Sequence, residues 1–160
     1  MNARQSTTHR FALSGVIAFL LVVLGACQYS VPITERPTRN VDNKLIGDWA
    51  SAHQGQRLKI RSLTNNTYIV SYSGFVFQAF HSDISGVPFL SVQELETDAR
   101  SYSYLIYRVS EDGTKLYLRL VNDEILRGQT SSTKVVQKVL KQNLQNPALL
   151  HHEDEFTKVQ

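Results

Sequence analysis

The densest group of side chains that could do chemistry lies near the C-terminus, where His151, His152, Glu153, Asp154 and Glu155 follow one another. Imidazole and carboxylate groups are ligands for divalent metal ions. On a strand, His151, Glu153 and Glu155 would share one face, while the adjacent His152 would point to the other. No further ligand spacing in the sequence supports a site. We therefore expect a solvated charged stretch here, and no metal or other cofactor.

Patterns that carry catalysis are scarce in the chain. Glu94 and Glu96 would lie on one strand face about 6.6 Å apart, within the range of glycosidase carboxylate pairs, but an exposed polar strand end is the simpler interpretation. His53 and His81 are isolated and are interpreted as surface or internally bonded histidines. The sequence has no Gly-x-Ser-x-Gly elbow, no phosphate-binding loop and no dinucleotide fingerprint. We expect that the protein is not an enzyme.

The positive charge of the chain is concentrated at its N-terminus. The net charge of +3 and the pI near 9.1 would be typical of a nucleic-acid-binding protein. Residues 1–26, however, hold Arg4 and Arg10 and no acidic residue, so the rest of the chain has 15 basic and 14 acidic residues. This near balance removes the main support for a nucleic-acid partner.

Residues 1–26 have the plan of a secretory signal peptide, with a polar, positively charged start followed by an apolar run at 11–24. As a helix that run would be about 21 Å long, which is short of the ~30 Å hydrocarbon core of a bilayer. A transmembrane helix is therefore disfavoured. Small residues follow the run and precede Cys27, which is the single cysteine of the chain and excludes a disulfide framework.

The four residues Leu24-Gly25-Ala26-Cys27 resemble the lipobox of bacterial lipoproteins. The resemblance implies that Cys27 is lipidated and becomes the first residue of the mature chain. Acyl chains would then anchor the protein in a membrane of the cell envelope, facing the periplasm. Because Gln28, rather than Asp, follows the cysteine, sorting of the enteric type implies the outer membrane.

Residues 27–43 are interpreted as the lipidated cysteine and a tether. Pro32 and Pro37 disfavour both a helix and a central strand in this segment. If it were extended like polyproline, it would span roughly 50 Å and let the folded part stand off the lipid surface. The alternative is that part of the segment packs along the domain.

Residues 44–160 are predicted to form one β-rich domain. Short runs rich in β-branched and aromatic residues are separated by turn signals such as Asn65-Asn66, Ser73-Gly74 and Asp112-Gly113. The expected strands are residues 45–51, 57–63, 68–72, 75–81, 88–95, 102–109 and 115–121, with a last strand between 149 and 160 that has Phe156 as its anchor.

One segment has helical rather than strand periodicity. Between Ser131-Ser132 and Asn146-Pro147, apolar residues recur at the i, i+3, i+4 spacing of an amphipathic helix. Either serine is a natural N-cap, and the Asn-Pro pair is a natural stop. The pattern predicts about three helical turns, with one face, including Val136 and Leu140, packed against the sheet.

The order of these elements predicts a mainly β fold, either a small antiparallel meander or a barrel, with one C-terminal amphipathic helix. Gly47-Asp48-Trp49, at the entrance of the domain, resembles the Gly-x-Trp motif of the lipocalins and the wider calycin group. The resemblance implies a lipocalin-like barrel, complete or incomplete, in which Gly47 and Trp49 are structural and the Trp packs across the closed end.

The candidate contact residues are tyrosines and one arginine on predicted strands. A tyrosine has an apolar body and a polar tip, which suits a pocket lining, an interface or an ordinary barrel wall. The residues that could face a ligand or a partner are Tyr68, Tyr72, Tyr102, Tyr104, Tyr117 and Arg119.

Two functions from different classes follow as hypotheses. In the first, the domain is a binding module that holds a small apolar ligand or a partner protein. In the second, it is a structural, assembly or inhibitor lipoprotein that docks on an envelope protein through a sheet face and has no internal ligand. A roomy apolar interior would favour the first, and a filled interior with an exposed apolar patch would favour the second.

Overall fold

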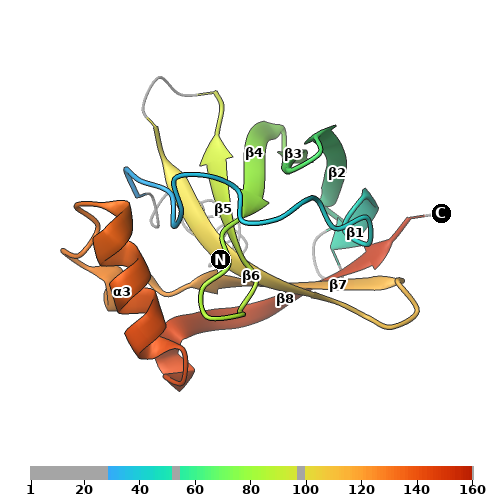
Figure 1. Ribbon diagram of the computed structural model, residues 1–160. Coiled ribbons are helices and arrows are strands. Elements are labelled where there is room, and N and C mark those ends of the chain that lie inside the picture. The colour runs from blue at the N-terminus through green and yellow to red at the C-terminus, as the bar shows by residue number, and fades with distance from the viewer. Residues whose placement is uncertain (1–28, 52–54, 97–99, 160) are drawn as a thin grey trace, which may run out of the picture.

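The computed structural model describes residues 29–51, 55–96 and 100–159. Within these residues eight strands form a closed antiparallel barrel in which each strand pairs with its neighbours in sequence (Figure 1). The strands are β1 (Gly47–Ser51), β2 (Arg57–Thr64), β3 (Thr67–Tyr72), β4 (Phe75–His81), β5 (Phe89–Glu94), β6 (Tyr102–Val109), β7 (Lys115–Val121) and β8 (Leu150–Lys158). The expected signal peptide of residues 1–26, and Cys27 with it, lie outside the described residues.

Pairing of the first strand with the last completes the barrel. On β1, Trp49 pairs with Leu58 of β2 on one side and with Lys158 of β8 on the other. The prediction of a mainly β, lipocalin-like barrel is confirmed, and of the two forms that the sequence left open the barrel is the complete one. The last strand, expected between residues 149 and 160, is also present.

The predicted helix is α3 (Thr133–Asn143), and it lies between β7 and β8 beside the barrel (Figure 1). The side chain of Ser132 caps it by accepting a hydrogen bond from the N–H of Val135, as expected for an N-cap serine. Two shorter helices that the pattern did not predict, α2 (Asp123–Leu126) and η1 (Pro147–Leu149), flank α3 in the sequence.

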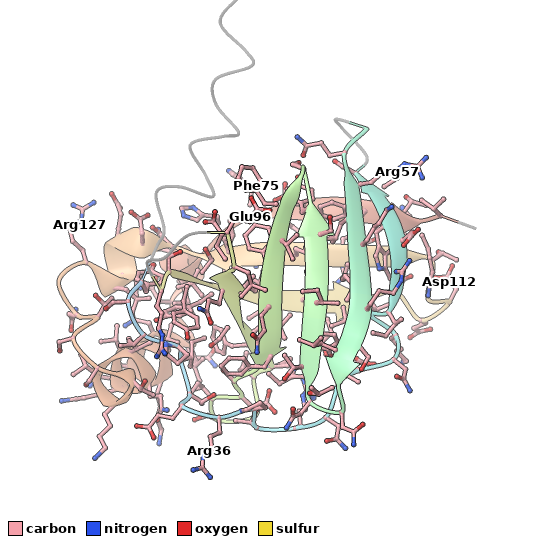
Figure 2. The ribbon with its side chains drawn as sticks, turned by 90° about the horizontal axis from the view of Figure 1, so that it is seen from above. Arg36, Arg57, Phe75, Glu96, Asp112 and Arg127 are labelled. Carbon is pink, nitrogen blue, oxygen red and sulfur yellow. The ribbon has the colours of Figure 1, made fainter. Side chains whose placement is uncertain are left out.

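The two ends of the barrel differ. At the end that we call the closed end, the segment before β1 crosses beneath the strands, where Leu45 is buried and the N–H of Val41 donates to the carbonyl of Asn65. At the opposite end, which we call the open end, β3 ends and β4 begins. Figure 2 shows Phe75 and Glu96 at this open end and Arg36 at the other.

The segment expected to be a tether is packed against the barrel instead. The backbone of Tyr29 exchanges two hydrogen bonds of 2.8 Å with Tyr102, and the N–H of buried Ile33 donates to Ser91 Oγ at 3.0 Å. Further along, the N–H of Thr38 donates to the carbonyl of His81. The described part of the expected tether, residues 29–43, therefore follows the outside of the barrel and then crosses beneath its closed end, so the folded unit begins before residue 44.

A second apolar core lies outside the barrel wall. Tyr104 of β6 and Phe89 of β5 point outward and are covered by the N-terminal segment and by Val136 and Leu140 of α3. This layer explains why the sequence places apolar residues on both faces of some strands. It also confirms that α3 packs one face against the sheet.

Candidate functional site

The interior of the barrel is filled at the closed end and partly accessible toward the open end. Most inward-facing residues of the closed half are buried, among them Ile60 and Leu116, and Trp49 is fully buried above them, while Tyr107 and Val109 are only partly buried. Inward-facing apolar residues further up the wall keep part of their surface in contact with solvent. These residues form what we call the upper wall: Val70, Tyr72, Phe77, Val92, Leu105, Leu118 and Leu120. We call this interior the cup: its buried residues form the floor, and its wall combines the partly buried apolar residues with Glu94, which pairs with Phe77, and Asp154, which pairs with Leu118.

The strand register assigns the upper wall to the inside. Val70 pairs with Phe77 across β3 and β4, and Leu105 pairs with Leu120 across β6 and β7. Directly paired residues point to the same face of a sheet, and Val70 and Leu105 both pack against the inner core. The accessible apolar surface therefore belongs to the lumen and not to the outside of the barrel.

A few polar groups lie beside the upper wall. The hydroxyl of Tyr72 donates a hydrogen bond to the side-chain oxygen of Gln56, and its ring packs edge-on against Phe156. Burial, and next to it the nearby carboxylate of Asp154, raise the pKa of Tyr72 above its ordinary value. The hydroxyl therefore stays protonated at neutral pH, and the site can offer hydrogen bonds to one polar end of an otherwise apolar molecule.

Trp49 and Gly47, the two motif residues, pack beside Lys158 of β8. Trp49 is fully buried in the inner core, and its indole N–H donates to the carbonyl of Leu45 at 3.0 Å. Lys158 of β8 lies over the indole, with its nitrogen 5.1 Å from the ring centre. A Cβ on Gly47, whose φ is 155°, would lie 2.8 Å from Cε of Lys158. The glycine leaves room for the lysine stem to cross the tryptophan.

A polar network forms the floor of the cup. Nε2 of His81 and the hydroxyl of Tyr68 are 2.8 Å apart, and that hydroxyl also accepts from the backbone N–H of Asp42. The hydroxyl of Tyr107 donates to the Asp42 carboxylate at 3.1 Å. The chain segment before β1 is thereby bonded to side chains from the inside of β3 and β6, and through Tyr68 to His81 of β4. This network joins the packing of the N-terminal segment to the floor of the barrel.

The histidine of this network is neutral at neutral pH. Burial, together with the positive charge of Arg39, lowers the pKa of His81 to about 4, although Asp83 and Asp42 act in the opposite direction. Burial also raises the pKa of Tyr68 to about 12. Because Tyr68 accepts from a backbone N–H, its own proton is directed at Nε2, which leaves the imidazole proton on Nδ1. Nδ1 is buried and finds no hydrogen-bond partner among the described residues.

The structure separates the six candidate contact residues. Tyr72 lies on the upper wall, and Tyr68 is on the floor and buried. Tyr102 and Tyr104 point outward beneath the N-terminal segment, where the Tyr104 hydroxyl donates to the carbonyl of Val31 and its ring stacks on Tyr29 at 4.4 Å. The expectation that Tyr102 and Tyr104 face a ligand is therefore wrong, because another part of the chain covers them.

Tyr117 and Arg119 lie on the outer face of β7. The guanidinium of Arg108 covers the ring of Tyr117 at 3.7 Å from its centre. Arg119 donates through Nε to the carbonyl of His151 and through Nη2 to that of Leu150. These two side chains therefore lie on the opposite face of the wall from Tyr72, and a partner-facing role for them stays a prediction.

Two shallow surface grooves lie outside the barrel. One, of about 550 Å³, is lined by Arg119 together with residues of η1 and β8, including His151 and His152. The other, of about 460 Å³, lies between the β4–β5 loop and the lysines of α3. Both open broadly to solvent, and neither contains a residue of the upper wall.

The part of the chain described by the structure contains no group of three histidine, cysteine or acidic side chains placed to hold a metal ion. Within the same residues, no helix is long and apolar enough to cross a membrane. Comparisons with models of protein families, with curated proteins and with solved structures find no match to this chain.

The sequence interpretation missed most of the upper wall and the histidine of the floor. Phe77, Ala79 and His81 occur at alternate positions of one strand, so their shared phase could have placed His81 inside the barrel. For Val92 and Leu118 the alternation was visible, but nothing local indicated which face was the interior.

Proposed function

We propose that this protein is a lipid-anchored lipoprotein of the bacterial envelope, held at Cys27, whose barrel binds a small, elongated apolar molecule. The chemistry of the cup favours an acyl chain with one polar end. The proposed location is the periplasmic face of the outer membrane, on the basis of the lipobox resemblance and of Gln28 after the cysteine.

The observation that carries the binding proposal is the contrast between the two halves of the lumen. In the closed half, most inward side chains are buried against one another, although Tyr107 and Val109 are only partly buried. In the upper half, inward side chains of the same apolar type stay accessible, and Phe75 at the rim is 36% exposed. An apolar wall open to water gains free energy when an apolar ligand covers it, at roughly 25 cal/mol per Å² buried. Tyr72 and Gln56 are among the polar groups that would fix the orientation of such a ligand.

The experiment is titration of the full chain with cis-parinaric acid, a fluorescent fatty acid, followed by displacement with unlabelled fatty acids. Phe77→Ser removes an apolar side chain from the upper wall and should weaken binding about tenfold, which follows from the loss of roughly 1.5 kcal/mol of apolar burial. Val76→Ser is the matched control, because Val76 is the next residue on β4, is similarly half-buried and points outward. Its affinity should stay within about twofold of the parent value.

The binding proposal fails if the chain binds no acyl probe, or if the two substitutions weaken binding equally. Native mass spectrometry of the chain purified from its own envelope supplies a second test. A co-purified molecule of a few hundred daltons that Phe77→Ser releases would support the proposal. The anchor is tested separately by metabolic labelling of the chain with a radioactive fatty acid, which Cys27→Ser should abolish.

A further inference from the structure

The described chain begins at the open end of the barrel. Tyr29 pairs with Tyr102, the first residue of β6, along the edge that extends beyond the end of β7. From there the N-terminal segment runs toward the closed end, where Thr38 bonds to His81 and Val41 bonds to Asn65. The part of the chain that precedes Tyr29 therefore joins the barrel near its open rim.

The proposed anchor is only two residues away from this point. Cys27 precedes Tyr29 by two positions, and two residues span at most about 7 Å in any conformation. Because both backbone groups of Tyr29 are bonded to Tyr102, the described part of the chain offers no slack to lengthen this reach. A lipid attached at Cys27 would hold the open rim, and not the closed end, against the bilayer.

The same rim carries exposed apolar side chains. Phe75, at the start of β4, is 36% exposed, and Leu95, just after β5, is 44% exposed. The N–H of Leu95 donates to the carbonyl of Val76, the residue that follows Phe75. This bond places Leu95 beside the start of β4, and so beside Phe75, on the rim. Figure 2 shows Phe75 next to Glu96 at this end of the barrel.

The rim residues lie close to the place where the chain enters. Tyr102 pairs with Gln93 of β5, and β5 pairs in turn with β4. Tyr29 and the start of β4 are thus separated by three inter-strand steps, or about 15 Å. The apolar rim and the anchor would therefore reach one membrane surface together.

We propose that the open rim, formed by Phe75 and Leu95, docks on the lipid bilayer, so that the mouth of the barrel opens onto the membrane. The inference rests on the proposed anchor at Cys27. It deepens the proposed binding function, because a ligand with an acyl chain would then pass between the bilayer and the cup without crossing water. A third exposed apolar residue, Leu63, is 53% exposed but lies near the end of β2 at the closed end. It should stay away from the lipid.

The experiment compares two tryptophan probes in the full, lipidated chain reconstituted in phosphatidylethanolamine–phosphatidylglycerol vesicles. Phe75→Trp places a probe on the open rim, and Leu63→Trp is the matched control on the opposite end. Trp49, the single native tryptophan, is buried and contributes the same background to both. Brominated acyl chains quench tryptophan at short range, so the rim probe should lose at least twice as large a share of its emission as the control and shift to the blue.

Each outcome has a distinct meaning. Vesicle flotation of the parent chain is measured first, and a lipidated chain that does not float overturns the anchor together with this inference. If the chain floats but both probes are quenched equally, or the Leu63→Trp probe more strongly, the orientation is wrong while the anchor stands. If the Phe75→Trp emission is already shifted to the blue in detergent and the chain has the mass of a dimer, the rim binds a second copy and docking on lipid is refuted. Unchanged unfolding midpoints of both variants ensure that the probes report on folded protein.

Discussion

The buried histidine on the floor of the barrel should make the stability of the protein depend on pH. His81 is fully buried, and its Nε2 is bonded to Tyr68. Its pKa is lowered to about 4 in the folded chain, whereas the unfolded chain should bind the proton with the ordinary value of about 6.5. Between these two values the unfolded state holds more protons than the folded state. The contribution of neutral His81 to the free energy of unfolding is therefore present above about pH 6.5 and is lost as the pH falls toward 4.

The size of the effect follows from the two pKa values. Between pH 7 and pH 5, linkage gives a loss of about 2 kcal/mol from this one group. The charged groups near the imidazole are Arg39, which opposes its protonation, and Asp42 and Asp83, which favour it. Tyr68 and Tyr107 also face it, but burial keeps both hydroxyls protonated throughout this range. No other group of the floor should therefore reverse the direction of the change.

The assay is urea unfolding of the full chain at pH 7 and pH 5, followed through the fluorescence of Trp49. The comparison is with His81→Gln, whose side-chain oxygen can still accept a hydrogen bond but whose charge does not titrate. Exposed histidines and carboxylates contribute equally to both proteins, so the difference between their pH dependences isolates His81. The parent should lose about 2 kcal/mol more than the variant on acidification. Equal losses would refute a neutral, buried His81.

Three further outcomes are expected. Leu140→Asp, which puts an unpaired charge into the outer core, should destabilise the fold by at least about 4 kcal/mol in urea unfolding. The control, Lys138→Asp on the exposed face of α3, should destabilise it by under about 1 kcal/mol. Similar losses for the two variants would contradict the packing of α3. Ile33→Ala should cost about 2 to 4 kcal/mol by the same measurement, because a buried side chain leaves a cavity, and a neutral result would mean that the N-terminal segment adds little to the fold. Cys27→Ser should release the protein from membranes washed with salt and carbonate, and a variant retained on them would rule out the lipid anchor.

The strands and α3 could be predicted because their signals are local. Alternation in β6 and β7, the Asp112-Gly113 turn and the serine cap of α3 each depend on residues within a few positions of one another. Closure of the barrel could not be deduced in this way. It depends on the pairing of Trp49 with Lys158, which are far apart in sequence. That pairing forms only when the intervening strands have accumulated the right twist and stagger.

The side chains of the site were harder to assign because period-two alternation defines two faces without saying which one is inside. Tyr72 and Tyr104 have the same residue type and similar strand settings, yet Tyr72 faces the lumen and Tyr104 the outer core. The outcome depends on what covers the outer face. Here the cover is the N-terminal segment, whose prolines correctly indicated an extended chain but carried no signal of its partners. Those partners, Ser91 and Tyr102, lie more than 50 residues away in sequence.

That segment also gives the proposals a common physical basis. It starts at the open rim through Tyr29 and ends beneath the floor, where the backbone N–H of Asp42 bonds to Tyr68. A tether that was free to move would let the barrel take any orientation on the membrane, and the rim would then meet the lipid only by chance. Because the segment is bonded along the wall, the proposed anchor would be held at a fixed position relative to the mouth. The proposed orientation of the cup would then depend on how residues 29–43 pack. Ile33→Ala, by loosening that packing, should reduce the difference in quenching between the Phe75→Trp and Leu63→Trp probes.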